Sequence, residues 1–225
     1  MNSPFDYRFW SRWVVANALG ELIGLGGVGL VGYAVVRFAG EPNSAAAALS
    51  FAALAILLGA FEGAVVGLFQ RRVLRRRLPQ LQWWVTATVI GAVAAWFLGM
   101  VPSTIVQLQG SPSRASPEEV SDFLQLVLAV PLGGIAGLVL AMAQWRVLRR
   151  HTSGAGWWLP ANALAWAFGM PLVFVAAGVG RGDGVFGTIA IVVLSLGAAG
   201  AIVGAIHGWF LCRVLAHPNR SSDDA

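Results

Sequence analysis

The sequence contains no lysine, one cysteine and few charged side chains. Only 11% of its 225 residues are charged, whereas a typical soluble domain carries roughly 25%. A chain with so little charge cannot cover a water-facing surface, which excludes an ordinary soluble domain. The single cysteine, Cys212, excludes a disulfide within the chain.

Familiar catalytic and metal-binding motifs are also missing. The sequence has no H-E-x-x-H, no G-x-S-x-G, no phosphate-binding P-loop and no paired cysteines. His207 is the only histidine inside a long apolar segment, so this chain alone cannot build a bis-histidine haem site or a histidine-rich metal site. We therefore expect no catalytic residues, no metal and no other cofactor.

Long apolar stretches make up most of the chain. Hydrophobic residues account for 57% of it, and the mean hydropathy is +0.72. A helix that crosses a bilayer needs about 20 mostly apolar residues. Six stretches satisfy this requirement: 13–38, 46–69, 83–106, 123–145, 157–179 and 185–211. The predicted fold is an all-α membrane protein with six transmembrane helices in one domain (13–215). It is flanked by a cytoplasmic interfacial lead-in (1–12) and a disordered cytoplasmic tail (216–225).

The arginines are distributed unevenly around these stretches. Twelve of the fifteen precede the first stretch or follow the second, fourth or sixth, and only Arg37, Arg114 and Arg181 lie on the other side. Because arginine resists translocation, this distribution places both termini in the cytoplasm. The net charge of +5 is then a topology signal, and we expect no nucleic-acid partner. We predict a multi-pass protein of the bacterial inner membrane. Its expected partner is the lipid bilayer, and other membrane-protein subunits stay an open alternative.

Three segments place a small residue at every fourth position ahead of an arginine-rich end. They align on the tripeptide Arg-Val-Leu that begins at Arg72, Arg146 and Arg213. Residues four positions apart lie on one face of a helix, and small residues let helices approach closely within a bilayer. We therefore predict helix-packing faces at nine aligned positions: Gly59, Gly63, Gly67, Gly133, Gly137, Ala141, Gly200, Gly204 and Gly208.

The other three predicted helices also align with one another. Each has a tryptophan and, four positions later, a polar residue: Trp13 and Asn17, Trp84 and Thr88, Trp158 and Asn162. Together the two alignments divide the chain into three tandem helical hairpins, with repeats at about 13–78, 83–150 and 157–215. Because each unit crosses the membrane twice, all three have the same orientation. The simplest arrangement is an internal repeat around a pseudo-threefold axis.

Eight of the ten tryptophans lie near the predicted cytoplasmic ends of helices: Trp10, Trp13, Trp83, Trp84, Trp145, Trp157, Trp158 and Trp209. We expect their indole rings to lie at the acyl boundary with each N–H in the headgroup layer. A pigment or quinone site is the alternative. Gln70 and Gln144 occupy equivalent helix ends, where we expect them to bond a neighbouring helix or lipid headgroups.

Three ionisable residues lie inside the predicted helices, namely Glu21, Glu62 and His207. Ionisable groups at such depth are costly and mark candidate functional sites. Glu62 and His207 each directly precede a small residue of the aligned faces, so we expect them to approach each other, with Glu21 joining from the first helix. Asn17 and Asn162 complete this candidate intramembrane polar cluster. Two roles stay open for it: hydrogen bonding that holds helices together, or a relay for protons or cations.

One helix end carries a resemblance to other proteins. The sequence Gln-Trp-Arg-Val-Leu-Arg at 144–149, followed by Gly-Trp-Trp at 156–158, resembles a pattern in uncharacterised bacterial multi-pass membrane proteins. The resemblance covers the junctions between successive hairpins and implies no activity and no site residues. Three hairpins are also superficially similar to mitochondrial carriers. The Pro-x-Asp/Glu-x-x-Lys/Arg signature of that family is missing here, which excludes the match.

Two functions remain open from the sequence. The first is a structural, accessory or interaction subunit without catalytic chemistry. The second is a small proton- or cation-coupled transporter or channel, with Glu21, Glu62 and His207 lining a cavity that faces the cytoplasm. The two differ in whether these side chains meet in a hydrated cavity or lie singly in packed helix interfaces.

Overall fold

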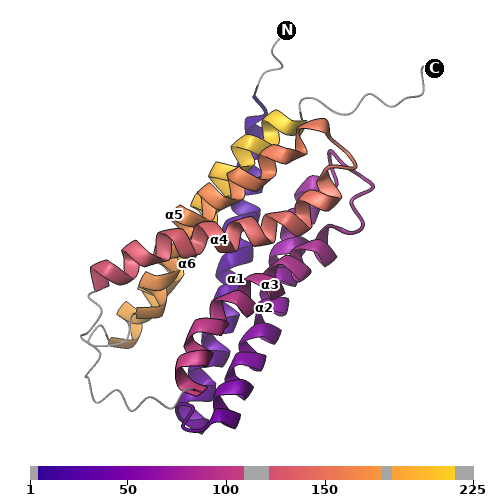
Figure 1. The fold of residues 1–225 in the computed structure, drawn as a ribbon. Coiled ribbons are helices and arrows are strands. Elements are labelled where there is room, and N and C mark those ends of the chain that lie inside the picture. Colours follow the sequence, from indigo (N-terminus) through magenta and orange to yellow (C-terminus); the bar gives the residue numbers. More distant parts are fainter. Residues whose placement is uncertain (1–4, 109–121, 179–183, 216–225) are drawn as a thin grey trace, which may run out of the picture.

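The computed structural model of the chain describes residues 5–108, 122–178 and 184–215 (Figure 1). This part of the chain forms six long α-helices and one short 3-10 helix: α1 (Tyr7–Ala39), α2 (Ala45–Leu74), α3 (Trp84–Leu108), α4 (Asp122–Leu148), η1 (Ser153–Trp157), α5 (Trp158–Gly178) and α6 (Gly184–Leu215). All six α-helices are long and apolar enough to cross a membrane. The predicted class, an all-α multi-pass membrane protein, is confirmed.

The first helix is longer than predicted. It begins at Tyr7, ahead of the predicted start at Trp13, because the side chain of Asp6 caps it by accepting a hydrogen bond from the Phe9 amide at 3.0 Å. The end of the predicted lead-in (1–12) is therefore continuous with α1 and does not form a separate segment. The predicted tail (216–225) lies outside the described residues.

Short connections hold successive helices against each other. Between α1 and α2, Gly40 adopts a positive φ of 79°, which a residue with a side chain rarely tolerates, and Ser44 then caps α2. Between α4 and α5, the hydroxyl of Thr152 donates a hydrogen bond to the carbonyl of Val214 at 3.1 Å. That bond ties the start of η1 to the last turn of α6.

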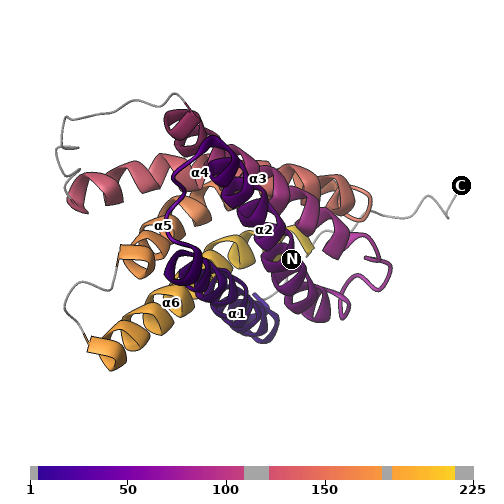
Figure 2. The same cartoon turned by 90° about the horizontal axis from the view of Figure 1, so that it is seen from below.

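The six helices form a closed ring. Each one packs against its neighbours in the chain, and α6 also packs against α1, as the end-on view shows (Figure 2). The start of α1 and the ends of α2, α4 and α6 lie at one end of the bundle (Figure 1). We call this the arginine-rich end, after the side chains found there: Arg8, Arg12, Arg71, Arg72, Arg75, Arg76, Arg77, Arg146, Arg149, Arg150 and Arg213.

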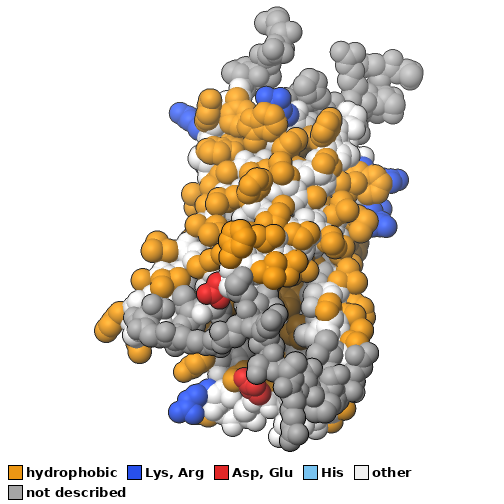
Figure 3. Space-filling view, turned by 60° about the vertical axis from the view of Figure 1, so that its left-hand side comes forward, with side chains coloured by type: hydrophobic (Ala, Val, Ile, Leu, Met, Phe, Trp, Pro, Cys, Tyr) orange, Lys and Arg blue, Asp and Glu red, His pale blue; other side chains and the backbone are white. Residues whose placement is uncertain are grey.

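The packed core lies in the half of the bundle nearest the arginine-rich end. The buried residues of α1 fall between Phe9 and Gly24, and those of α5 fall between Trp158 and Gly169. Toward the other end, helices α1, α2 and α3 diverge from helices α4, α5 and α6 (Figure 1). Apolar side chains cover the outside of the bundle (Figure 3), as expected of a surface that contacts acyl chains.

The small residues of the even helices face the odd helices that follow them around the ring. The stripe on α2 meets α3, that on α4 meets α5, and that on α6 meets α1. A β-carbon added at Gly137 would lie 2.5 Å from the carbonyl oxygen of Asn162, and one added at Gly200 would lie 2.6 Å from that of Asn17. These helices therefore touch backbone to backbone. The positions in contact are Gly59, Gly63 and Gly67 on α2, Gly133 and Gly137 on α4, and Gly200, Gly204 and Gly208 on α6; Ala141 is fully buried.

We predict that Gly137→Leu destabilises the bundle, because the new side chain has no room between α4 and α5. Overpacking of this kind typically costs about 1–3 kcal/mol. The measurement is the thermal transition of the detergent-purified protein, followed by size-exclusion chromatography. Gly99→Leu on α3 is the matched control, since nothing lies within 4 Å of an added β-carbon there. Equal transitions for the two variants would contradict the packing described here.

Candidate functional site

Three tryptophans form the centre of the core near the arginine-rich end. Trp13, Trp84 and Trp158 come from α1, α3 and α5, and each is at most 1% exposed. The ring of Trp158 makes edge-on contacts with the other two, at centroid distances of 6.2 Å to Trp13 and 5.8 Å to Trp84. The prediction that these indoles lie in the headgroup layer is wrong. Their chain neighbours Trp83 and Trp157, by contrast, are 56% and 63% exposed.

Two glutamines satisfy the buried indole N–H groups of α3 and α5. Trp84 donates to the side-chain oxygen of Gln70 on α2, and Trp158 donates to that of Gln144 on α4, each at 3.0 Å. A buried N–H without an acceptor is costly in an apolar interior, so these hydrogen bonds allow the two indole rings to be buried in the core. Of the two partners expected for these glutamines, a neighbouring helix or lipid headgroups, the structure shows the neighbouring helix.

The glutamine amides extend these pairs into a network across five helices. Gln70 donates to the side-chain oxygen of Asn17 at 2.8 Å, and Gln144 donates to the hydroxyl of Thr88 at 2.9 Å. The Gln144 amide also lies 3.3 Å from the side-chain oxygen of Gln70, which joins the two halves. Side chains of α1, α2, α3, α4 and α5 are thus linked through one buried set of hydrogen bonds.

The polar residue four positions after each tryptophan makes the same bond in all three odd helices. Its side chain donates to the backbone carbonyl of that tryptophan: Asn17 to Trp13 at 2.7 Å, Thr88 to Trp84 at 2.9 Å and Asn162 to Trp158 at 3.0 Å. This bond orients the amide or hydroxyl so that its oxygen is available to the next helix. At Asn17 and Thr88 that oxygen accepts from a glutamine.

His207 accepts the third indole N–H. Trp13 donates to Nδ1 of His207 at 2.9 Å, and the imidazole packs against Trp13 and Trp158 at centroid distances of 5.7 and 5.1 Å. The side chain is only 1% exposed. Because Nδ1 is the acceptor, the ring in this arrangement is a neutral imidazole that closes the α6–α1 interface. Among the described residues no hydrogen bond or ion pair joins it to Glu21 or Glu62.

The two intramembrane glutamates lie on neighbouring helices, α1 and α2. Glu62 on α2 accepts a hydrogen bond from the indole N–H of Trp96 on α3 at 2.5 Å, and its side chain lies against Gly24 of α1. Glu21 lies on α1 one turn before Gly24. One carboxyl oxygen of Glu21, Oε2, is buried without a hydrogen-bond partner. The candidate cluster is therefore divided into a carboxyl pair and a tryptophan-centred network.

Four tryptophans of this arrangement were not singled out as site residues from the sequence. Trp96 has no aligned partner in the other odd helices, so nothing marks it as a ligand of Glu62. Trp13, Trp84 and Trp158 were aligned, but their pairing with glutamines on other helices depends on the ring order, which the alignment alone does not specify. At the position aligned with the two glutamines, α6 has Leu211, and His207, one turn earlier, accepts the indole N–H instead.

Comparison of the chain with protein-family models, curated proteins and solved structures finds no match. Within the described ranges, no group of three or more His, Cys, Asp or Glu side chains is placed to hold a metal ion. The geometry of the site is therefore the basis for its proposed function.

We predict that Trp84→Phe and Trp158→Phe each lower the thermal stability of the purified protein. Both changes keep an aromatic ring but remove an indole donor, at a cost of about 1–2 kcal/mol. Trp158→Phe leaves the buried Gln144 oxygen without its donor, and Trp84→Phe leaves the Gln70 oxygen only the longer bond from the Gln144 amide. Trp83→Phe and Trp157→Phe are the matched controls, one position away in the chain and exposed. If all four variants melted alike, the indole–glutamine bonds would not contribute to stability.

Proposed function

We propose that this chain is a non-catalytic integral protein of the bacterial inner membrane that serves as a structural, accessory or interaction subunit. The observation that carries this proposal is the mutual satisfaction of its intramembrane polar groups. Gln70, Gln144 and His207 each accept an indole N–H from another helix. Groups paired in this way hold a bundle together and leave few donors or acceptors for a substrate.

Internal repetition is part of the proposal. The chain is built from three tandem hairpins around a pseudo-threefold axis, in which each even helix supports the tryptophan of the next odd helix. The pairs Gln70 with Trp84 and Gln144 with Trp158 support the repeat. The third pair, His207 with Trp13, has the same role with a different acceptor. A ring of this kind is complete only when α6 meets α1.

The arginine-rich end is proposed to face the cytoplasm. Arginine resists translocation, and the start of α1 and the end of α6 lie at this end. The outer surface of the helices is apolar, with side chains such as Phe38 and Phe186 almost fully exposed. This surface suits lipid, or the apolar face of another membrane subunit, and offers nothing to nucleic acid.

One observation favours a second candidate function, a small proton- or cation-coupled transporter or channel. Oε2 of Glu21 is buried without a hydrogen-bond partner, one turn before Gly24, against which the Glu62 side chain packs. A proton or a small cation between the two carboxyl groups would satisfy it. The transporter would use the Glu21–Glu62 pair alone, since His207 is engaged with Trp13.

Purified protein in liposomes tests the two candidates. For a structural subunit we predict no proton, sodium or potassium flux above that of protein-free liposomes between about pH 4 and pH 8, a range that includes the ordinary pKa values of glutamate and histidine. Glu62→Gln keeps an oxygen that can accept from Trp96, so we expect its membrane abundance and thermal transition to match the wild type. A pH-dependent flux that disappears in Glu62→Gln, with abundance unchanged, would replace the first candidate by the second.

A further inference from the structure

A groove of about 400 Å³ lies between α1 and α2 at the arginine-rich end. Its lining combines cationic and apolar side chains, chiefly Arg12, Val15, Leu19, Phe69, Arg72 and Arg76. No acidic residue lines it. It is separate from the buried polar network, whose members do not contribute to its walls.

The groove is polar at one end and apolar at the other. On α1, the residues Arg12, Val15 and Leu19 follow each other at the spacing of one helix face. On the opposite wall, Arg76 and Phe69 are the charged and apolar ends. Each wall spans seven residue steps, or about 10 Å at 1.5 Å per residue. Both walls run in the same direction, from guanidinium groups at the membrane surface to apolar side chains deeper in the bilayer.

The three guanidinium groups of the groove have no anionic partner in the described part of the chain. The carboxylate of Asp6 pairs with Arg77, which does not line the groove. The Arg72 guanidinium lies 5.9 Å from the centre of the Phe69 ring, a cation–π contact that keeps it over the apolar wall. Three cations close together and without counter-charge make a site for an anion.

A second hollow of about 600 Å³ shares two of these arginines. It is lined by Arg72, Arg75, Arg76 and Pro79. Arg72 and Arg76 therefore line both hollows, and an anionic group in either one would contact them. A headgroup that carries two phosphates suits this arrangement better than a headgroup with one.

We propose that this groove binds an anionic phospholipid, with phosphate on Arg12, Arg72 and Arg76 and an acyl chain along Val15, Leu19 and Phe69. Arginine recognises phosphate through paired, charge-assisted hydrogen bonds, and basic pockets between transmembrane helices bind cardiolipin-type headgroups. The apolar half of the groove distinguishes a lipid from free phosphate, which has nothing to place there. Cardiolipin, with two phosphates, is the expected tightest ligand.

The test uses the full-length chain, delipidated in a non-ionic detergent. Affinity is measured by native mass spectrometry and by the shift of the thermal transition on addition of cardiolipin, phosphatidylglycerol, phosphatidylcholine or inorganic phosphate. We expect binding in the order cardiolipin, then phosphatidylglycerol, and no specific binding of phosphatidylcholine or of phosphate alone. Equal binding of phosphatidylcholine and cardiolipin would overturn the proposal. So would equal stabilisation by phosphate, which would indicate an anion site without a lipid.

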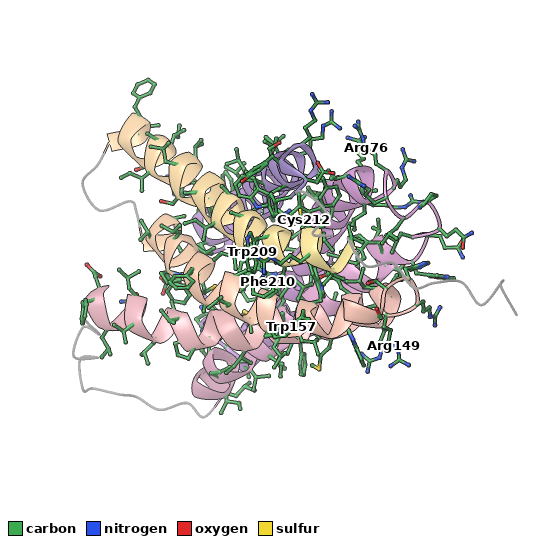
Figure 4. All side chains as sticks on the ribbon, turned by 90° about the horizontal axis from the view of Figure 1, so that it is seen from above. Arg76, Arg149, Trp157, Trp209, Phe210 and Cys212 are labelled. Atoms are coloured by element: carbon green, nitrogen blue, oxygen red, sulfur yellow. The ribbon has the colours of Figure 1, made fainter. Side chains whose placement is uncertain are left out.

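Paired arginine variants locate the site. Arg12→Gln with Arg76→Gln should weaken cardiolipin binding roughly 10- to 30-fold, because two headgroup contacts are lost. Arg149→Gln with Arg150→Gln removes the same charge at the same end, and Arg149 lies on a different side of the bundle from Arg76 (Figure 4). This control pair should bind cardiolipin like the wild type. Equal weakening in both pairs would mean that net charge alone attracts the lipid.

Two further variants keep the result interpretable. Arg12→Lys with Arg76→Lys retains the charge, so it should retain most of the cardiolipin binding even if the glutamine pair folds poorly. Val15→Gln, at a position that is 55% exposed, places a polar group on the apolar wall and should weaken cardiolipin binding without removing a cation. Binding unchanged in Val15→Gln and in the glutamine pair would remove the groove as the site.

Discussion

Close approach of helix backbones is the constraint on which the rest of this structure depends. Lipid tails are as apolar as leucine, so burying apolar side chains gives helices in a bilayer little reason to associate. Small residues do favour association, because the absence of bulky side chains lets helix backbones touch and dispersion contacts accumulate. The contacts of Gly137 with Asn162 and of Gly200 with Asn17 bring whole helix faces together. That closeness is what puts the side chains of adjacent helices within hydrogen-bonding distance.

The buried network follows from this closeness. An indole N–H and a glutamine amide are costly in an apolar interior unless each finds a partner. Trp84 and Trp158 find theirs on α2 and α4, helices pressed against α3 and α5 by small residues. The third interface is built differently, with His207 supporting Trp13 at the α6–α1 contact that closes the ring. Packing and polar pairing therefore depend on each other.

The sequence predicted the six helices and the small-residue positions, because each leaves a local pattern in length, spacing or alignment. For Gln70 and Gln144 it left two partners open, a neighbouring helix or lipid headgroups. It did not predict the burial of Trp13, Trp84 and Trp158. An indole at a helix end has the same local signature whether it faces headgroups or the core. The sequence also did not predict that His207 is separated from Glu62. A position next to a small residue indicates on which face of its own helix a side chain lies, but it does not indicate which neighbouring helix that face contacts. Those outcomes depend on the order of helices around the ring.

An experimental structure of the chain in a lipid nanodisc is the most direct test of this account. We predict that the small-residue faces of α2, α4 and α6 lie against α3, α5 and α1, with no lipid between them and with Trp13, Trp84 and Trp158 enclosed at their centre. Acyl-chain density along the faces that carry Gly63, Gly137 and Gly204 would contradict it.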